Sequence, residues 1–297
     1  MNWILVAIIA YFLYAIVFLL DKYLLMGPIP SPKTYSFYIG ALGGVILVLV
    51  PFIGFSLPDP SQLPIILSAG AAYILGLLWF YRALQLHEAS RITPAIGGMI
   101  PVFSILLLFF ISGEIPEIIS IFALLLLVTG TVLITYRKSF DFNSLKISAT
   151  AAVFWAIHFV LIKYIYLEND FWDSLVWIKS GGALISLTFL FSKEVREGLF
   201  GQRIKLSKKT AAVFFLTQGM GATANVLQNW AIALGPLVAA ALVPAFQGIQ
   251  YVFLFIIAVF VSFRFPQLLK EETSKKIIFQ KAVSILLIAG GILLLSI

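Results

Sequence analysis

The chain has 297 residues, of which 61% are hydrophobic and 11% are charged, and its formal net charge is +7. Soluble domains usually hold about 45–50% apolar and about 25% charged residues, so a soluble enzyme or nucleic-acid-binding protein is excluded, because so few charges cannot cover so much apolar surface. The chain has no cysteine and only two histidines. Thiolate chemistry and a histidine metal cluster are therefore not expected, nor is any cofactor or nucleic-acid partner.

Ten stretches are long and apolar enough to cross a bilayer, which takes about 20 helical residues. We predict membrane-spanning helices at 3–20, 35–55, 64–85, 91–112, 116–136, 146–166, 172–191, 210–233, 236–263 and 277–296. Proline and glycine mark several of the breaks between them, as at 27–32, 57–60 and 235–236. The expected fold class is an all-α integral membrane protein with ten transmembrane helices.

The chain repeats itself. Residues 14–23 (YAIVFLLDKY) match residues 155–164 (WAIHFVLIKY) at an offset of 141, with six of ten positions identical, and a weaker match relates 83–86 to 231–234. We predict a first five-helix repeat over residues 1–140 and a second over 141–297. Because five is odd, the second repeat begins on the opposite side of the membrane, so the two are inverted, as in many secondary transporters.

The distribution of basic residues predicts the orientation. Eighteen of the 20 lysines and arginines lie in the loops after the first, third, fifth, seventh and ninth spans or at the adjacent helix ends; the exceptions are Lys163 and Lys179. The positive-inside rule places these loops in the cytoplasm and both termini outside. The expected location is the plasma membrane of a prokaryotic cell, in contact with membrane lipids.

Several short segments resemble the EamA-like branch of the drug/metabolite transporter superfamily. They are Ala83-Leu84-Gln85-Leu86, Ile100-Pro101-Val102-Phe103, Gly113-Glu114 and Gly130-Thr131-Val132-Leu133. The second half departs from the pattern, because it lacks the matching proline and carries a longer linker at 264–272. Members commonly have cytoplasmic termini, whereas the charge distribution here places them outside. The resemblance implies transport of small organic solutes without ATP.

Polar residues at membrane depth are costly and are candidates for function. On span eight, four amides share one helical face, and on span nine two amides and a tyrosine do so, one turn after Pro244, which we expect to bend the helix. They are Gln218, Asn225, Gln228 and Asn229 on span eight and Gln247, Gln250 and Tyr251 on span nine. The stripes predict an amide-lined, substrate-binding cavity; the alternative is hydrogen bonding between packed helices.

Two ionisable residues and an aromatic wall extend this prediction. Lys179 lies about 12 Å into span seven at 1.5 Å per residue, and His158 lies at the centre of span six. Either side chain suits a carboxylate or phosphate, although Lys179 could also reach the headgroups. Tyr73, Trp79 and Tyr14 supply rings for stacking or for core packing. Lys22 and Lys163 are related by the repeat, and we expect both to reach the membrane interfaces.

The acidic residues all fall in loops or at span ends, with Asp21 at the end of the first span. The leading hypothesis is therefore a secondary transporter of small polar metabolites such as amino acids, which works by facilitated transport or exchange or has His158 as its only proton carrier. One alternative is a flippase for a polyprenyl-phosphate-linked or other lipid-linked sugar. Another is a scaffold or sensor that transports nothing. An enzyme is not expected, and the sequence leaves a homo-oligomer open.

Overall fold

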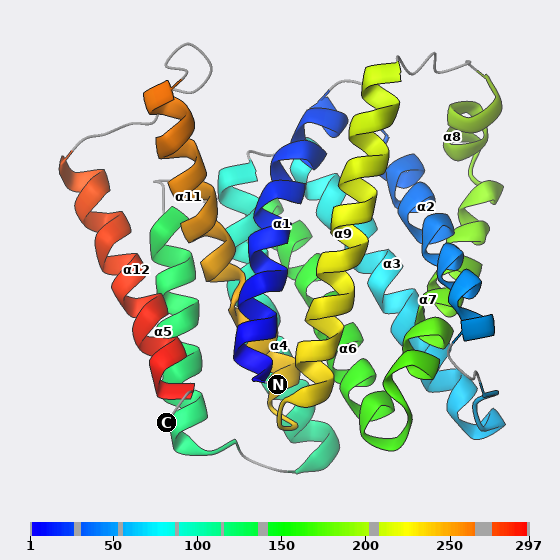
Figure 1. Cartoon of the computed structure of the whole chain (residues 1–297), viewed down its shortest axis with the longest axis horizontal. Coiled ribbons are helices and arrows are strands. Elements are labelled where there is room, and N and C mark those ends of the chain that lie inside the picture. The colour runs from blue at the N-terminus through cyan, green and yellow to red at the C-terminus, as the bar shows by residue number, and fades with distance from the viewer. Residues whose placement is uncertain are drawn as a thin grey trace.

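The computed structural model describes residues 2–26, 31–52, 56–86, 89–113, 116–135, 142–201, 208–264 and 275–295. Within these ranges the chain is helical and contains no strand (Figure 1). In chain order, the elements are α1 (Trp3–Met26), α2 (Pro32–Gly43), η1 (Gly44–Phe52), η2 (Pro60–Gln62), α3 (Leu63–Leu86), α4 (Ala89–Ser112), α5 (Ile118–Thr135), α6 (Phe142–Glu168), α7 (Phe171–Leu187), η3 (Thr188–Phe191), α8 (Lys193–Arg196), η4 (Glu197–Gly201), α9 (Lys208–Leu234), α10 (Ala239–Ala245), α11 (Gln247–Arg264) and α12 (Lys275–Leu295).

Seven helical segments of the described chain are long and apolar enough to cross a membrane, and two shorter apolar helices lie at Ile118–Leu133 and Phe279–Leu295. The predicted all-α integral membrane class is confirmed at this level. Helix α9 is not among the seven, because its amides lower its hydropathy, yet it packs along α1 inside the bundle.

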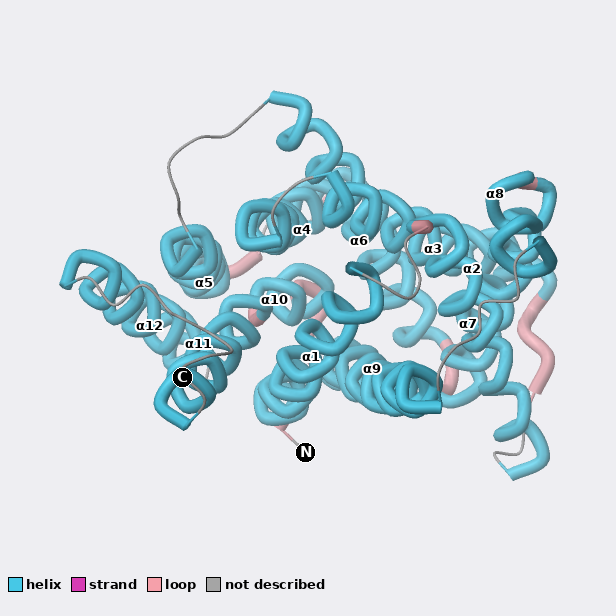
Figure 2. The backbone as a smooth tube through the Cα atoms, turned by 90° about the horizontal axis from the view of Figure 1, so that it is seen from above, coloured by secondary structure: helices cyan, strands magenta, loops and turns pink. Residues whose placement is uncertain are grey.

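The helices form two facing rows when the bundle is seen from above (Figure 2). One row holds α4, α6 and α3, and the other holds α11, α10, α1 and α9, with α6 and α1 near the centre of each. Helices α2 and α7 pair at one end of the bundle, and α5 and α12 pair at the other. Satisfied backbone hydrogen bonds make such helices the natural spanning unit in lipid.

Two spans are interrupted where a cavity lies beside them. The second changes from α-helix to a 3₁₀ helix at Gly44, and the ninth breaks at Phe246, between α10 and α11. The break lies two residues after Pro244, where we expected the helix to bend, whereas the turn that precedes Pro244 remains α-helical. After the break, the amide of Ile249 donates to the Phe246 carbonyl at 2.8 Å, a tighter pattern than in an α-helix.

Glycines allow the closest helix approaches. A Cβ atom at Gly70 of α3 would lie 2.4 Å from the backbone nitrogen of Gly182 on α7. One at Gly291 of α12 would lie 2.9 Å from the Ala123 carbonyl oxygen on α5. Small residues in membrane helices favour such contacts, because close backbone approach replaces the hydrophobic driving force that lipid cannot supply.

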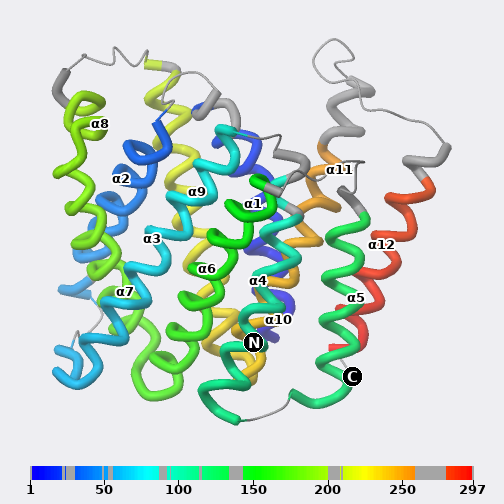
Figure 3. Tube along the Cα trace, turned by 180° about the vertical axis from the view of Figure 1, so that it is seen from behind, coloured from blue at the N-terminus to red at the C-terminus, as the bar shows by residue number. Residues whose placement is uncertain are grey.

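The start of α1 and the end of α12 lie at the same end of the bundle (Figure 1). The end of α3 and the starts of α9 and α12 lie at the opposite end, as the view from behind shows (Figure 3). Of the described basic residues, Arg82 lies near the end of α3 and Lys208 begins α9, so both lie toward this second end of the bundle (Figure 3). We call it the basic end.

Two neighbouring glycines of α12 provide a matched test of this packing. We expect Gly291→Ala to lower the free energy of unfolding by about 1–3 kcal/mol, because the added methyl group meets Leu127 and the Ala123 carbonyl. Gly290→Ala should be neutral or stabilising, because its nearest neighbour would lie at an ordinary 3.8 Å. Thermal unfolding of both purified variants in detergent measures this; equal effects would contradict the packing of α5 against α12.

Candidate functional site

A cavity of about 730 Å³ lies between the two rows of helices. Its wall on α1 runs from Tyr11 to Asp21, and its wall on α9 runs from Phe215 to Gln228. Helices α2, α3, α4, α6, α7, α10 and α11 and the 3₁₀ segment η1 contribute the remainder. These stretches are centred near the middle of α1 and α9, so the cavity occupies the central part of the bundle.

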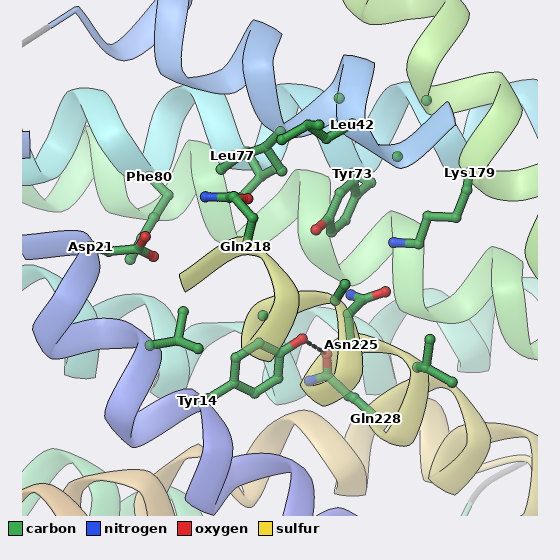
Figure 4. Close-up of a pocket in the computed structure, with 18 of the residues that line it drawn as sticks. Tyr14, Asp21, Leu42, Tyr73, Leu77, Phe80, Lys179, Gln218, Asn225 and Gln228 are labelled. Atoms are coloured by element: carbon green, nitrogen blue, oxygen red, sulfur yellow. Dashed lines mark hydrogen bonds between the residues drawn. The ribbon is translucent and has the colours of Figure 1, made fainter. Parts of the chain in front are cut away.

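The four amides on the polar face of α9 have two roles: three line the cavity, and one joins α9 to a neighbouring helix. Gln218, Asn225 and Gln228 line the cavity (Figure 4), as their spacing on one helical face predicts. Asn229 is not among the lining residues. Its Nδ2 donates to the Asn225 carbonyl at 2.8 Å, and its Oδ1 accepts from the Tyr166 hydroxyl at 2.8 Å. Asn229 therefore joins α9 to α6.

Gln228 connects the walls of the cavity. Its Nε2 donates to the Tyr11 hydroxyl at 2.9 Å, and its Oε1 accepts from the Tyr14 hydroxyl at 3.1 Å (Figure 4). The Tyr11 hydroxyl in turn donates to the Pro244 carbonyl at 3.4 Å. One amide thus ties α9 to α1 and, through Tyr11, to the break in span nine.

The polar residues of α11 likewise fall into lining and supporting residues. Gln247 and Gln250 line the cavity, whereas Tyr251 does not. The Nε2 of Gln247 donates to the Tyr251 hydroxyl at 3.3 Å, and the Nε2 of Gln250 donates to the Tyr14 carbonyl at the same distance. Tyr251 therefore orients a lining amide from behind.

Lys179 enters the cavity from α7 (Figure 4). Its ammonium lies 4.2 Å from the centre of the Tyr73 ring, a cation–π contact worth roughly 0.5–2 kcal/mol. Tyr73 lines the cavity as well. Among the residues that the structure describes, no carboxylate forms an ion pair with Lys179, so its charge faces the cavity.

His158 lies behind this pair and is not among the lining residues. Its ring centre is 5.1 Å from that of Tyr73, and its Nδ1 lies 2.9 Å from the Ala69 carbonyl oxygen on α3. The other ring nitrogen, Nε2, is buried with no hydrogen-bond partner. His158 therefore contacts a lining residue, Tyr73, and does not itself reach the cavity.

The predicted aromatic wall is present in part. Tyr14 and Tyr73 line the cavity together with Phe80, Tyr81 and Trp155. Trp79 is not among the lining residues; its ring lies 5.2 Å from the guanidinium carbon of Arg82, one turn along the same helix. Two of the three predicted rings thus reach the cavity.

Asp21 is a lining residue that sequence reasoning did not select, because it was placed at the end of the first span. Its Oδ1 accepts a hydrogen bond from the Tyr35 hydroxyl of α2 at 2.5 Å, and that hydroxyl accepts one from Nε2 of Gln218 at 3.3 Å. The helical period could have predicted this position, because Asp21 lies on the same face of α1 as Tyr11, Tyr14 and Phe18. All four residues line the cavity.

Lys163 corrects a prediction. We expected it to reach the membrane interface, but its side chain is 1% exposed and its ammonium donates to the carbonyls of Ile232, Ala233 and Gly235 at 3.1, 3.2 and 2.6 Å. These carbonyls lie at or just beyond the end of α9, where no further helical amide can bond to them. Lys163 caps the helix that carries the amide stripe.

Within the described ranges, no group of three or more His, Asp or Glu side chains is arranged to hold a metal ion. The lining combines amides, aromatic rings, one carboxylate and one ammonium. Such a set recognises an organic solute through hydrogen bonds, stacking and charge.

Comparison with known proteins identifies the class. Residues 1–136 match the EamA-like transporter family, which confirms the resemblance to the drug/metabolite transporter superfamily. A search of curated protein sequences finds no significant match. Twenty-eight chains of solved structures match the fold. One of them, described only as "Crystal structure of protein", has a TM-score of 0.68 at 18% identity and covers 98% of this chain and 95% of its own.

At 18% identity, this structural similarity supports only the assignment of the fold. The sequence match over residues 1–136 and the apolar helices together indicate a membrane transporter of the drug/metabolite type. Both observations concern the class of protein, whereas the choice of substrate depends on the residues of the cavity.

The cap at Lys163 is open to a direct test. We expect Lys163→Met to lower the free energy of unfolding by about 1–3 kcal/mol, because it leaves buried carbonyls without donors. Lys146→Met, at an exposed position of the same helix, is the matched control and should have little effect. Denaturant unfolding in detergent measures the difference, and indistinguishable variants would rule out the cap.

Proposed function

We propose that the protein is a secondary transporter that moves small polar metabolites such as amino acids across the membrane by alternating access, without ATP. The observation that carries this proposal is the cavity of about 730 Å³, in which Gln218, Asn225, Gln228, Gln247 and Gln250 converge inside an apolar helix bundle. Amides bind hydroxyl, carboxylate or ammonium groups without requiring a charge. A transporter needs such a site, strong enough to select the solute and weak enough to release it.

We further propose that ten helices cross the membrane as two inverted five-helix repeats, residues 1–140 and 141–297. The helix contacts support this, because the pairing of α3 with α6 has its counterpart in that of α9 with α1. So do the glycines of the α5–α12 pair. Gly130 of α5 packs against Ser284 and Ile288 of α12, and Gly291 of α12 packs against Ala123 and Leu127 of α5. The three α5 residues and the three α12 residues correspond at a constant offset of 161, so the two glycine contacts are equivalent.

Alternating access would then consist of rocking the two rows of helices against each other; each row combines helices of both repeats (Figure 2), and the repeats make the two rows equivalent. In one state the cavity would open to the basic end, which the positive-inside rule places in the cytoplasm, with the chain ends outside. Two equivalent rows of helices supply the inverse arrangement, in which the opposite half would open.

A second candidate is a flippase for a lipid-linked sugar. It is favoured by the side of the cavity formed by Val45 and Val48 of η1 and Phe215 of α9, all more than half exposed on the outside of the bundle. An apolar side opening would let a lipid tail remain in the bilayer while its headgroup enters. Transport of a water-soluble metabolite by the purified protein would decide against this candidate, as it would against a scaffold or sensor.

Neighbouring amides of α9 test the site. In proteoliposomes loaded with a mixture of amino acids, we expect Asn225→Leu and Gln228→Leu to reduce exchange at least about tenfold, because the cavity loses hydrogen-bonding groups. Asn229→Leu should instead lower thermal stability, since Asn229 joins α9 to Tyr166. Unchanged exchange in both lining variants, at equal protein levels, would refute the site.

Orientation and access are testable together because the chain has no cysteine. We expect Gln218→Cys in the cavity to react with a membrane-impermeant thiol reagent added from the cytoplasmic side. Ser61→Cys, which is exposed at the opposite end of the bundle, should react only from outside. The reverse pattern, or a cytoplasmic signal from a C-terminal reporter fusion, would overturn the proposed topology.

A further inference from the structure

The cavity holds two opposite charges that do not pair with each other. Asp21 of α1 and Lys179 of α7 both line it, and no ion pair joins them in the part of the chain that the structure describes. Figure 4 shows the two side chains toward opposite sides of the cavity, with Gln218 and Tyr73 between them. A charge held inside a membrane protein costs several kcal/mol unless it is compensated, so each of these groups calls for a partner.

The surroundings of each charge leave room for such a partner. Asp21 receives one hydrogen bond, from the Tyr35 hydroxyl to Oδ1, and no protein donor of the described residues bonds its Oδ2. The Lys179 ammonium rests on the Tyr73 ring, which neither removes its charge nor accepts a conventional hydrogen bond from it. The protein positions both groups and leaves binding capacity unused at each.

The separation of the two charges follows from α3. Tyr81 packs its ring 4.8 Å from that of Tyr35, the partner of Asp21, whereas Tyr73 carries Lys179. These two tyrosines are eight residues apart on one continuous helix. At 1.5 Å per residue, the backbones of these two tyrosines are offset by roughly 12 Å along the helix axis, which sets the scale of the separation between the two ends of the cavity.

The wall between the two ends is mainly apolar. Leu77 and Phe80 of α3 line it, together with Trp155 of α6 and Leu42 of α2. An extended aliphatic or aromatic segment would replace water along this wall and gain about 25 cal/mol per Å² of apolar surface removed from water. The amides of α9 also line the cavity and would bond to polar substituents of that segment.

We propose that the cavity binds an elongated zwitterion, with its amine at Asp21 and its acid group at Lys179. This rests on the proposed transport function and narrows its substrate class. A compound with charges about a nanometre apart and an apolar segment between them fits both ends at once. An α-amino acid, whose charges are adjacent, can satisfy only one end.

The test uses the purified full-length protein in lipid nanodiscs and a series of unbranched ω-aminocarboxylates of increasing length, beginning with glycine. Affinity is measured by titration calorimetry, with the monoamine and the monocarboxylate of each length for comparison. We expect affinity to pass through a maximum where the charge separation matches roughly 12 Å, and the zwitterion at that length to exceed either single-charge analogue. Affinity that is highest for glycine, or independent of length, would overturn the proposal.

Variants that remove one charge assign the two ends. We expect Asp21→Asn to weaken the optimal zwitterion at least about thirtyfold, as for loss of one buried charge partner, and to leave the monocarboxylate unaffected. Lys179→Gln should weaken the zwitterion and leave the monoamine unaffected. Lys193→Gln, whose side chain is 84% exposed, is the matched control. An equal loss for all ligands in either variant would indicate a structural role and refute the assignment.

The length series in the unmodified protein remains decisive if a variant fails to fold. The experiments also distinguish failure of the transport function from failure of the two-ended binding site. Amino-acid exchange that depends on Gln228 but shows no length optimum retains the transporter and removes the two-ended site. A length optimum with the expected variant pattern, but no exchange in proteoliposomes, retains the binding site and removes transport.

Discussion

The absence of water from the bilayer core is the constraint on which the structure depends. Backbone groups there must bond within their own helix, and each polar side chain must find a partner or face a cavity. The amides of α9 and Lys163 follow this rule, whereas the buried Nε2 of His158 has no hydrogen-bond partner. Lys163 caps α9 and Asn229 joins α9 to α6, whereas Gln218, Asn225 and Gln228 line the cavity. One physical requirement therefore produces both the packing contacts and the candidate site.

The cavity exists because helix separation varies within the bundle. Helices α3 and α7 approach closely at Gly70 and Gly182, and α5 and α12 do so at Gly130 and Gly291. Where α1 and α9 face α3, by contrast, the positions carry Tyr14, Tyr73 and amides. The hydrogen bonds of Gln228 and Gln250 to Tyr14 join helices within one row, and the space between the rows remains a cavity. The proline-associated break at Phe246 and the 3₁₀ segment from Gly44 border the same space. They are the places where a helix changes direction most readily, and alternating access would require such changes.

The charges of the cavity interrupt the repeat. Tyr14 and Trp155 are repeat-related and both line the cavity, as do Phe18 and Phe159. Asp21, however, corresponds to Ile162 in the matching segment. The aromatic lining thus follows the sequence match, whereas Asp21 does not. In the proposed two-ended site, such an asymmetric placement of charge would bind an elongated zwitterion in one orientation.

The sequence by itself determined the membrane class, the helices and the faces on which polar residues gather, because apolar length and the 3.6-residue period are local properties. It therefore predicted eight of the lining side chains, among them Lys179, Tyr73, Gln247 and Gln250. Only the tertiary structure decided that Asn229, Tyr251, Trp79 and His158 lie behind the lining, because a rotation of one residue about a helix changes the neighbour it meets. It alone also placed Asp21 in the cavity and Lys163 in the core. Both lie near span ends, where the partner helix rather than the sequence decides whether a charge meets lipid, carbonyl oxygens or a cavity.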